Sequence, residues 1–165
     1  MAVPVAGVAS APRPLVDAAV DAVMPAHEEE WFWEGNVQAM VVGYLAGSEW
    51  RIRRVANTAS SKHGVDIEAD RQGERLVIEV KGYPGSTYAR VERRGEAKIT
   101  PAAAQARAYF SNALLSGLVM RSEIPEARVV LAFPAITTFS NLGQRVAGPL
   151  AGPGIEVWFV TRTAP

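Results

Sequence analysis

The sequence contains no cysteine, and this absence excludes several kinds of chemistry. Disulfide scaffolds, thiolate nucleophiles and thiolate-bound metals all require that residue. Histidine is also scarce, with only His27 and His63, so a histidine-rich metal centre is excluded as well. Any metal ion bound here would therefore be a hard cation with oxygen ligands.

Excess charge and long apolar runs are missing too. Seventeen Lys and Arg balance seventeen Asp and Glu, so no whole-molecule field attracts the chain to nucleic acid or membrane, although a local basic patch still can. No apolar stretch approaches the roughly 18 residues of a membrane span. The first ten residues lack the positive region of a secretory signal. These absences predict a cytoplasmic protein with no membrane partner.

The length of 165 residues suits one domain with a hydrophobic core. Small residues and prolines dominate residues 1–13, which we expect to be a mobile tail, and residues 14–165 form the domain. Apolar residues at helical spacing predict helices over 14–24, 31–47, 100–120 and 136–150. Apolar runs and alternations predict strands over 49–57, 127–134 and 154–161, with a hairpin over 64–82.

The order of these elements indicates the fold class. From residue 31 onward the prediction is helix, three strands, helix, strand, helix, strand, which is an α/β arrangement with a mixed central sheet flanked by helices. The last strand–helix–strand unit predicts a parallel crossover. The apolar stripe of the helix over 31–47 also carries Glu34, and a carboxylate on a buried face needs a partner. That stripe comprises Val37, Met40, Val41, Tyr44 and Leu45.

The hairpin over 64–82 places acids among branched aliphatics. A two-residue turn at Gln72-Gly73 pairs residues whose numbers add to 145, so Asp66 faces Glu79. Directly opposed residues have Cβ atoms about 4.5–5.5 Å apart, and two carboxylates so close repel each other unless a cation lies between them. Alternation predicts one polar face, with Asp66, Glu68, Asp70, Glu79 and Lys81, and one core face, with Val65, Ile67, Ala69, Leu76, Ile78 and Val80.

The two opposed carboxylates predict a metal site. Asp66, Glu79 and the backbone carbonyl of Val80 are oxygen ligands of the kind that Mg²⁺ (or Mn²⁺) prefers. Lys81 could orient or help deprotonate a water held by the ion, or stabilise charge developing on a phosphate. Glu34 could complete the site through water. The alternative is that Glu79 and Lys81 belong to the ordinary solvated face of a hairpin.

This combination resembles the PD-(D/E)xK nuclease superfamily, which includes restriction endonucleases and Holliday junction resolvases. The matching residues are Asp66 in G-V-D-I, Glu79 and Lys81 in E-V-K, and Glu34 in the preceding helix. The resemblance runs over about residues 31–161, although no proline precedes Asp66, where the family's name has one. It implies a restriction-endonuclease-like αβββαβ core and Mg²⁺-dependent hydrolysis of DNA phosphodiesters, with these four residues as the catalytic set.

A second match lies in the helix over 100–120. Gln105 and Tyr109 look like the Q-x-x-x-Y element of some superfamily nucleases and share one helix face. They would contact the substrate backbone or the site. The alternative is that Tyr109 belongs to the core and Gln105 to the surface.

Basic residues that flank the site in sequence are candidates for positioning phosphates. The loop residues His63, Tyr83 and Tyr88 are further candidates, but a lone histidine is usually a spectator, and the tyrosines could simply pack the loop. Charge runs are also often solvated faces. The predicted substrate-binding set, besides Gln105 and Tyr109, is Arg51, Arg53, Lys62, Arg90, Arg93 and Arg94.

Two functions therefore stay open. The first is a metal-dependent DNA endonuclease, and the second is a catalytically silent nuclease-like domain that binds nucleic acid or serves as a partner subunit. The complete set of Glu34, Asp66, Glu79 and Lys81 favours the first. A single site per chain predicts a homodimer, since a duplex has two strands to cut, and Trp31 and Trp33 could supply the interface.

Overall fold

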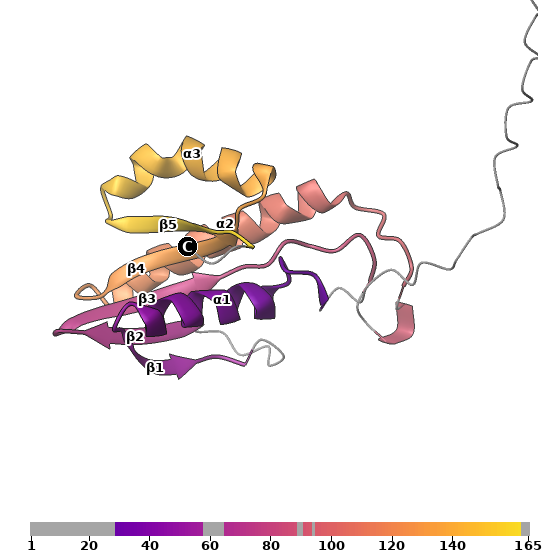
Figure 1. The fold of residues 1–165 in the computed structure, drawn as a ribbon. Helices are drawn as coiled ribbons and strands as arrows, with labels where there is room; N and C mark the ends of the chain where they lie inside the picture. The colour runs from indigo at the N-terminus through magenta and orange to yellow at the C-terminus, as the bar shows by residue number, and fades with distance from the viewer. Residues whose placement is uncertain (1–28, 58–64, 89–90, 94, 163–165) are drawn as a thin grey trace, which may run out of the picture.

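The computed structural model describes residues 29–57, 65–88, 91–93 and 95–162. The predicted tail and the predicted helix over 14–24 lie outside these ranges. The described elements (Figure 1) are α1 (Glu34–Gly47), β1 (Arg51–Val55), β2 (Ile67–Arg71), β3 (Glu74–Val80), the 3-10 helix η2 (Val91–Arg93), α2 (Ala102–Glu123), β4 (Arg128–Pro134), α3 (Thr137–Ala151) and β5 (Ile155–Val160).

The five strands form one mixed sheet in the order β1-β2-β3-β4-β5. The pairs β1–β2 and β2–β3 are antiparallel, whereas β3–β4 and β4–β5 are parallel. The predicted fold class is therefore confirmed: the element order αβββαβ, with a mixed sheet flanked by helices, is that of a restriction-endonuclease-like core. The parallel crossover through α3 is confirmed as well.

Helices cover both faces of the sheet (Figure 1). Two successive crossovers of the same hand, β3-α2-β4 and β4-α3-β5, place α2 and α3 on one face, and α1 covers the other. The face under α1 contributes a core of aliphatics: Val37, Val41 and Leu45 from the helix, and Ile67, Ala69, Leu76, Ile78, Val80, Val130 and Ala132 from the strands. The opposite core centres on stacked aromatic rings of Phe110, Phe133 and Phe139.

The hairpin has the predicted register. Ile67 pairs with Ile78 and Arg71 with Glu74, so paired numbers add to 145. Gln72 and Gly73 both have positive φ, 52° and 85°, as the tight turn of a two-residue hairpin requires.

The predicted separation into one core face and one wet face is only partly right. Val65 packs on the α2–α3 side, not with Ile67, because the chain bends at Asp66 and leaves the regular ladder there. On β3, the face predicted to be polar is covered: Val77 is fully buried and Glu79 is 6% exposed. The reason is that α2 packs over this part of the sheet.

One smaller expectation about α1 also changes. Tyr44 is 42% exposed and packs edge-on against Trp158 of β5, so it lies at the margin of the α1 core. The apolar stripe of α1 is wider than the surface that the helix buries against the sheet, so a residue at the edge of the stripe can reach solvent.

Among the described helices, none is long and apolar enough to cross a membrane.

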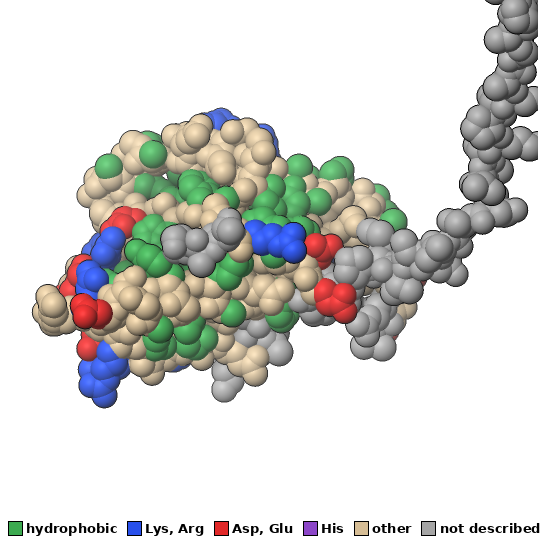
Figure 2. All heavy atoms as spheres, viewed as in Figure 1, with side chains coloured by type: hydrophobic (Ala, Val, Ile, Leu, Met, Phe, Trp, Pro, Cys, Tyr) green, Lys and Arg blue, Asp and Glu red, His purple; other side chains and the backbone are tan. Residues whose placement is uncertain are grey.

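Acidic and basic side chains meet at the hairpin end of the sheet, on the left in Figure 2. Arg75 contacts Glu68 and Glu126, and Arg128 contacts Glu156 and Glu74. Most of the charge on this end of the sheet is therefore neutralised by local ion pairs.

Candidate active site

Four charged residues meet where β3 ends. Glu34 begins α1, Asp66 precedes β2, Glu79 lies in β3 and Lys81 follows it. Their charges act on one another: Lys81 interacts with all three carboxylates, and Asp66 with both other acids. The structure thus brings together residues that lie up to 47 positions apart in the sequence.

Asp66 is held by the end of the hairpin. The regular ladder stops at Ile67–Ile78, and beyond it the Asp66 N–H donates to the Ile78 carbonyl over 3.0 Å. The Val80 N–H donates to Asp66 Oδ2 over 2.7 Å. Beyond the end of the ladder the Val80 N–H has no backbone acceptor on β2, and the Asp66 carboxylate takes that place. Asp66 thus lies close to Glu79, as predicted, but its carboxylate accepts a hydrogen bond from the backbone of Val80, the residue after Glu79.

Lys81 forms an ion pair with the buried Glu79. Its Nζ lies 2.7 Å from Glu79 Oε1 and donates to the Val80 carbonyl over 3.1 Å. Both are predicted ligands of the metal ion. In the arrangement seen here, the ammonium occupies the position between these two oxygen donors.

Glu34 approaches from α1. The Gly82 N–H donates to its carboxylate, and the Tyr83 N–H donates to the Phe32 carbonyl over 2.8 Å. These two bonds join the start of α1 to the chain that leaves β3. The Glu34 carboxylate is therefore held in place near Lys81, where it was predicted to complete the site through water.

Burial sets the protonation behaviour of the site. It raises the pKa of Glu34 and of Asp66, and it outweighs the Lys81 charge and the backbone N–H donors that act in the other direction. Burial by itself lowers the pKa of Lys81, but the charges of Glu79, Glu34 and Asp66 together outweigh it, and the net shift is upward. Lys81 is therefore an ammonium at neutral pH.

The donor set suits a hard divalent cation. Asp66 Oδ1 and Glu79 Oε2 have no hydrogen-bond partner in the part of the chain that the structure describes. Carboxylate and carbonyl oxygens are what Mg²⁺ and Mn²⁺ prefer. In the same ranges, no three His, Asp or Glu side chains gather as a complete metal-ligand cluster. A bound ion would thus depend on two carboxylates, one carbonyl and water.

Gln38 is a positioning residue that the sequence interpretation missed. It is buried, and its Nε2 donates to the Ala56 carbonyl over 3.1 Å and to the Asp66 carbonyl over 3.5 Å. It joins α1 to the backbone that carries Asp66. The available signal was its position four residues after Glu34, on the same helix face.

Gln105 and Tyr109 do not reach the four-residue site through any described contact. Gln105 Nε2 donates to the Thr100 carbonyl over 2.7 Å, at the start of its own helix. Tyr109 is half-buried against the α2–α3 core. Arg107, between them, instead points into the space between α2 and α3.

The predicted basic residues have several environments. Arg53 is ion-paired with Asp70, and Arg93 pairs with Glu96 and lies 4.0 Å from the ring centre of Tyr88. Arg51 is exposed on β1. Tyr83 packs edge-on against Phe32 and Phe139. Lys62, His63, Arg90 and Arg94 lie outside the described residues.

Comparison with known proteins gives two similar solved structures. One is an FdxN element excision controlling factor protein from Anabaena variabilis, 22% identical, with a TM-score of 0.45 over 76% of this chain and 92% of that chain. The other is an XisH family protein from Nostoc punctiforme, 25% identical, with a TM-score of 0.42 over 75% and 91%. No family model matches the chain, and no curated protein matches its sequence.

Proposed function

We propose that this protein is a divalent-metal-dependent deoxyribonuclease that hydrolyses phosphodiester bonds at the end of β3. The observation that carries the proposal is the meeting of Glu34, Asp66, Glu79 and Lys81 from separate elements, around carboxylate oxygens that accept no hydrogen bond from any described residue. Buried acids with raised pKa values that interact with a neighbouring lysine are typical of catalytic sites. An ion pair that only stabilises the surface does not require three acids and a lysine from separate elements to lie together.

Asp66, Glu79 and the Val80 carbonyl would hold Mg²⁺ or Mn²⁺. Such an ion would polarise the scissile phosphate and lower the pKa of a coordinated water. The Val80 N–H bond and Gln38 hold Asp66 in place, so the ligands require little rearrangement. Lys81 Nζ now contacts Glu79 Oε1 and the Val80 carbonyl, so the lysine side chain would have to move before these two oxygens could bind an ion.

The protonation states suggest how the residues divide the work. In hydrolysis, water oxygen bonds to phosphorus, the bond to the leaving oxygen breaks, and the proton of the water ends on solvent or on the leaving oxygen. A protonated Lys81 cannot remove that proton, so it stabilises the negative charge that develops on the phosphate. Glu34, whose pKa is raised, is suited to accept the proton.

The test is an assay on plasmid, linear, single-stranded and branched DNA, each with EDTA, Mg²⁺ or Mn²⁺. Cleavage that requires the metal and is lost in Glu79→Gln supports the proposal. DNA binding without cleavage under every metal condition would instead identify a silent nuclease-like domain.

A further inference from the structure

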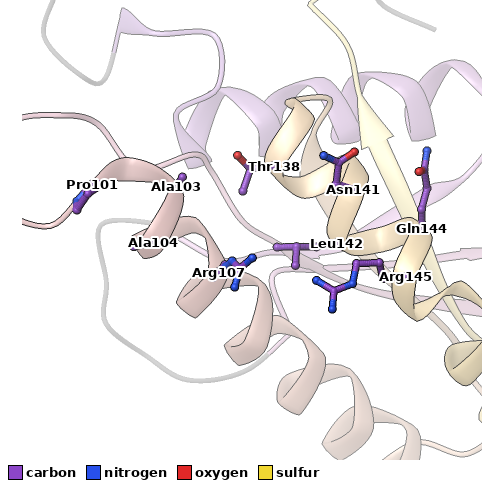
Figure 3. Close-up of a pocket in the computed structure, with 9 residues that line it drawn as sticks. All are labelled: Pro101, Ala103, Ala104, Arg107, Thr138, Asn141, Leu142, Gln144 and Arg145. Atoms are coloured by element: carbon purple, nitrogen blue, oxygen red, sulfur yellow. The ribbon is translucent and has the colours of Figure 1, made fainter.

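A basic groove runs between α2 and α3, with a volume of about 970 Å³. Its polar lining comes from Arg107 of α2 and from Thr138, Asn141, Gln144 and Arg145 of α3, and no described carboxylate lines it. Figure 3 shows Arg107 and Arg145 extending from the two helices into the same space. The groove therefore combines two positive charges with neutral hydrogen-bonding side chains.

These two arginines have no carboxylate partner among the described residues, unlike several other arginines of the chain. Arg53, Arg75, Arg93 and Arg128 each contact a carboxylate. Neither Arg107 nor Arg145 forms an ion pair within the described ranges. Two guanidinium groups that share a groove repel each other weakly in water, and an anion between them removes that repulsion. The arrangement thus favours an anionic ligand.

The groove is connected to the proposed active site through Tyr83, which lies on the chain that leaves β3. Thr138 lines it, and its Oγ1 lies 3.5 Å from the Tyr83 hydroxyl. Tyr83 follows Lys81 by two residues, so their Cα atoms are at most about 7 Å apart. The first turns of α2 and α3 also border the groove, through Pro101 and Thr138, and neither helix has a side-chain cap. Their positive ends add to the field.

We propose that the α2–α3 groove binds the sugar–phosphate backbone of the nucleic acid whose phosphodiester reaches the four-residue site, with Arg107 and Arg145 each contacting a phosphate. This inference rests on the proposed function, because a nuclease must hold the strand on one side of the cleaved bond. Asn141 and Gln144 supply neutral donors for sugar and phosphate oxygens. No base edge needs to enter the groove, so its contribution is independent of sequence.

The experiment measures the salt dependence of DNA binding in EDTA, where no metal-dependent cleavage occurs. Labelled 20-nucleotide single strands and duplexes of mixed sequence are titrated with wild type, Arg107→Gln and Arg145→Gln. Each lost phosphate contact lowers the slope of log K against log salt by about 0.7 for single strands or 0.9 for duplex. The control for the loss of one positive charge is Arg75→Gln, an exposed arginine at the hairpin end of the sheet, which should keep the wild-type slope.

Two further arms sharpen the result. Arg107→Lys keeps the charge and should retain most of the slope, because a point charge still displaces counterions. Inorganic phosphate should compete only at far higher concentrations than the oligonucleotide. Phosphate binding as tight as that of the oligonucleotide would mean a small-anion pocket and would contradict the proposal. Melting curves check that the exposed substitutions leave the fold intact.

The outcomes separate this inference from the proposed function. If wild type binds and cleaves DNA while Arg107→Gln and Arg145→Gln keep its slope, the groove assignment is wrong and the nuclease proposal stands. If both variants lose slope but no metal supports cleavage, the groove assignment holds and the nuclease proposal fails. Absence of DNA binding by wild type overturns both.

Discussion

Gly82 packs directly against the first residue of α1, Glu34. A Cβ atom built on Gly82 would lie 2.3 Å from the Glu34 backbone nitrogen and 2.9 Å from the Phe32 carbonyl oxygen. The Gly82 N–H also donates to the Glu34 carboxylate. Gly82, the residue after Lys81, therefore sets how closely α1 approaches the four-residue site, and only glycine fits there.

Gly82→Ala should destabilise the protein by about 1–3 kcal/mol, because the added methyl group forces α1 away from the end of β3. Urea unfolding measures the change. The matched control is Gly43→Ala in the middle of α1, where a Cβ meets nothing within 4 Å. That substitution should stabilise by about 0.5–1 kcal/mol. Equal effects of the two substitutions would contradict the close approach at Gly82.

Asp66→Asn should weaken Mg²⁺ and Mn²⁺ binding without unfolding the protein. The amide oxygen still accepts the Val80 N–H bond, while the charged ligand and its repulsion of Glu79 are lost. Altering a residue that only orients a ligand costs about 10–100-fold in metal affinity, so loss of a direct ligand should cost at least about ten-fold. Calorimetry measures it, and an unchanged dissociation constant would eliminate Asp66 as a ligand.

Lys81→Ala should reduce cleavage steeply while the protein remains folded in Mg²⁺. Loss of a positioned electrostatic donor to the charge that develops on the phosphate costs roughly 10²–10³-fold. Single-turnover cleavage at saturating Mg²⁺ gives the rate, with Arg75→Ala as the control for loss of one positive charge. The variant should also melt earlier in EDTA, because buried Glu79 loses its partner, and Mg²⁺ should restore part of that loss. A variant that cuts at the wild-type rate would place the chemistry elsewhere.

Glu34→Gln should make the metal-free protein more stable at neutral pH. The pKa of Glu34 is raised by burial, so the folded state binds its proton more tightly than the unfolded state does. Above the ordinary value of 4.5 the unfolded state binds fewer protons, and stability falls as pH rises through the folded pKa. Gln has no such charge. The gain should therefore appear at pH 7 and vanish at about pH 4 and below, as melting curves in EDTA would show.

The protein should be a homodimer if it cuts both strands of a duplex. Each chain offers one four-residue site, and two copies supply the second. Trp31 is half-buried before α1 and is the candidate contact, whereas Trp33 packs over Gly35 and serves the fold. Light scattering with and without Trp31→Ala measures the mass. A monomer at working concentration that makes double-strand breaks would contradict this expectation.

The sequence by itself determined the elements from residue 31 onward and the hairpin register. Alternation on β2 and β3, with Gln72-Gly73 at the turn, allows only one pairing that buries Ile67, Leu76 and Ile78 together. The sequence pattern predicts the strands and their register because both depend on residues that are close together in the chain. For the same reason Asp66, Glu79 and Lys81 could be recognised as one group, since a hairpin brings them together.

Tertiary structure alone decided the rest of the site. Glu34 meets Lys81 only because α1 docks on Gly82, and Gln38 supports Asp66 only through that docking. Val65 changes faces because the chain bends at Asp66. The sequence shows Arg53, Arg93 and Arg107 as equivalent charges, yet the first two are ion-paired and the third has no carboxylate partner within the described part of the chain. Whether an arginine is neutralised depends on which carboxylates the fold brings next to it, and these can lie far away in the sequence, as Asp70 does from Arg53. A local sequence pattern therefore does not predict the pairing.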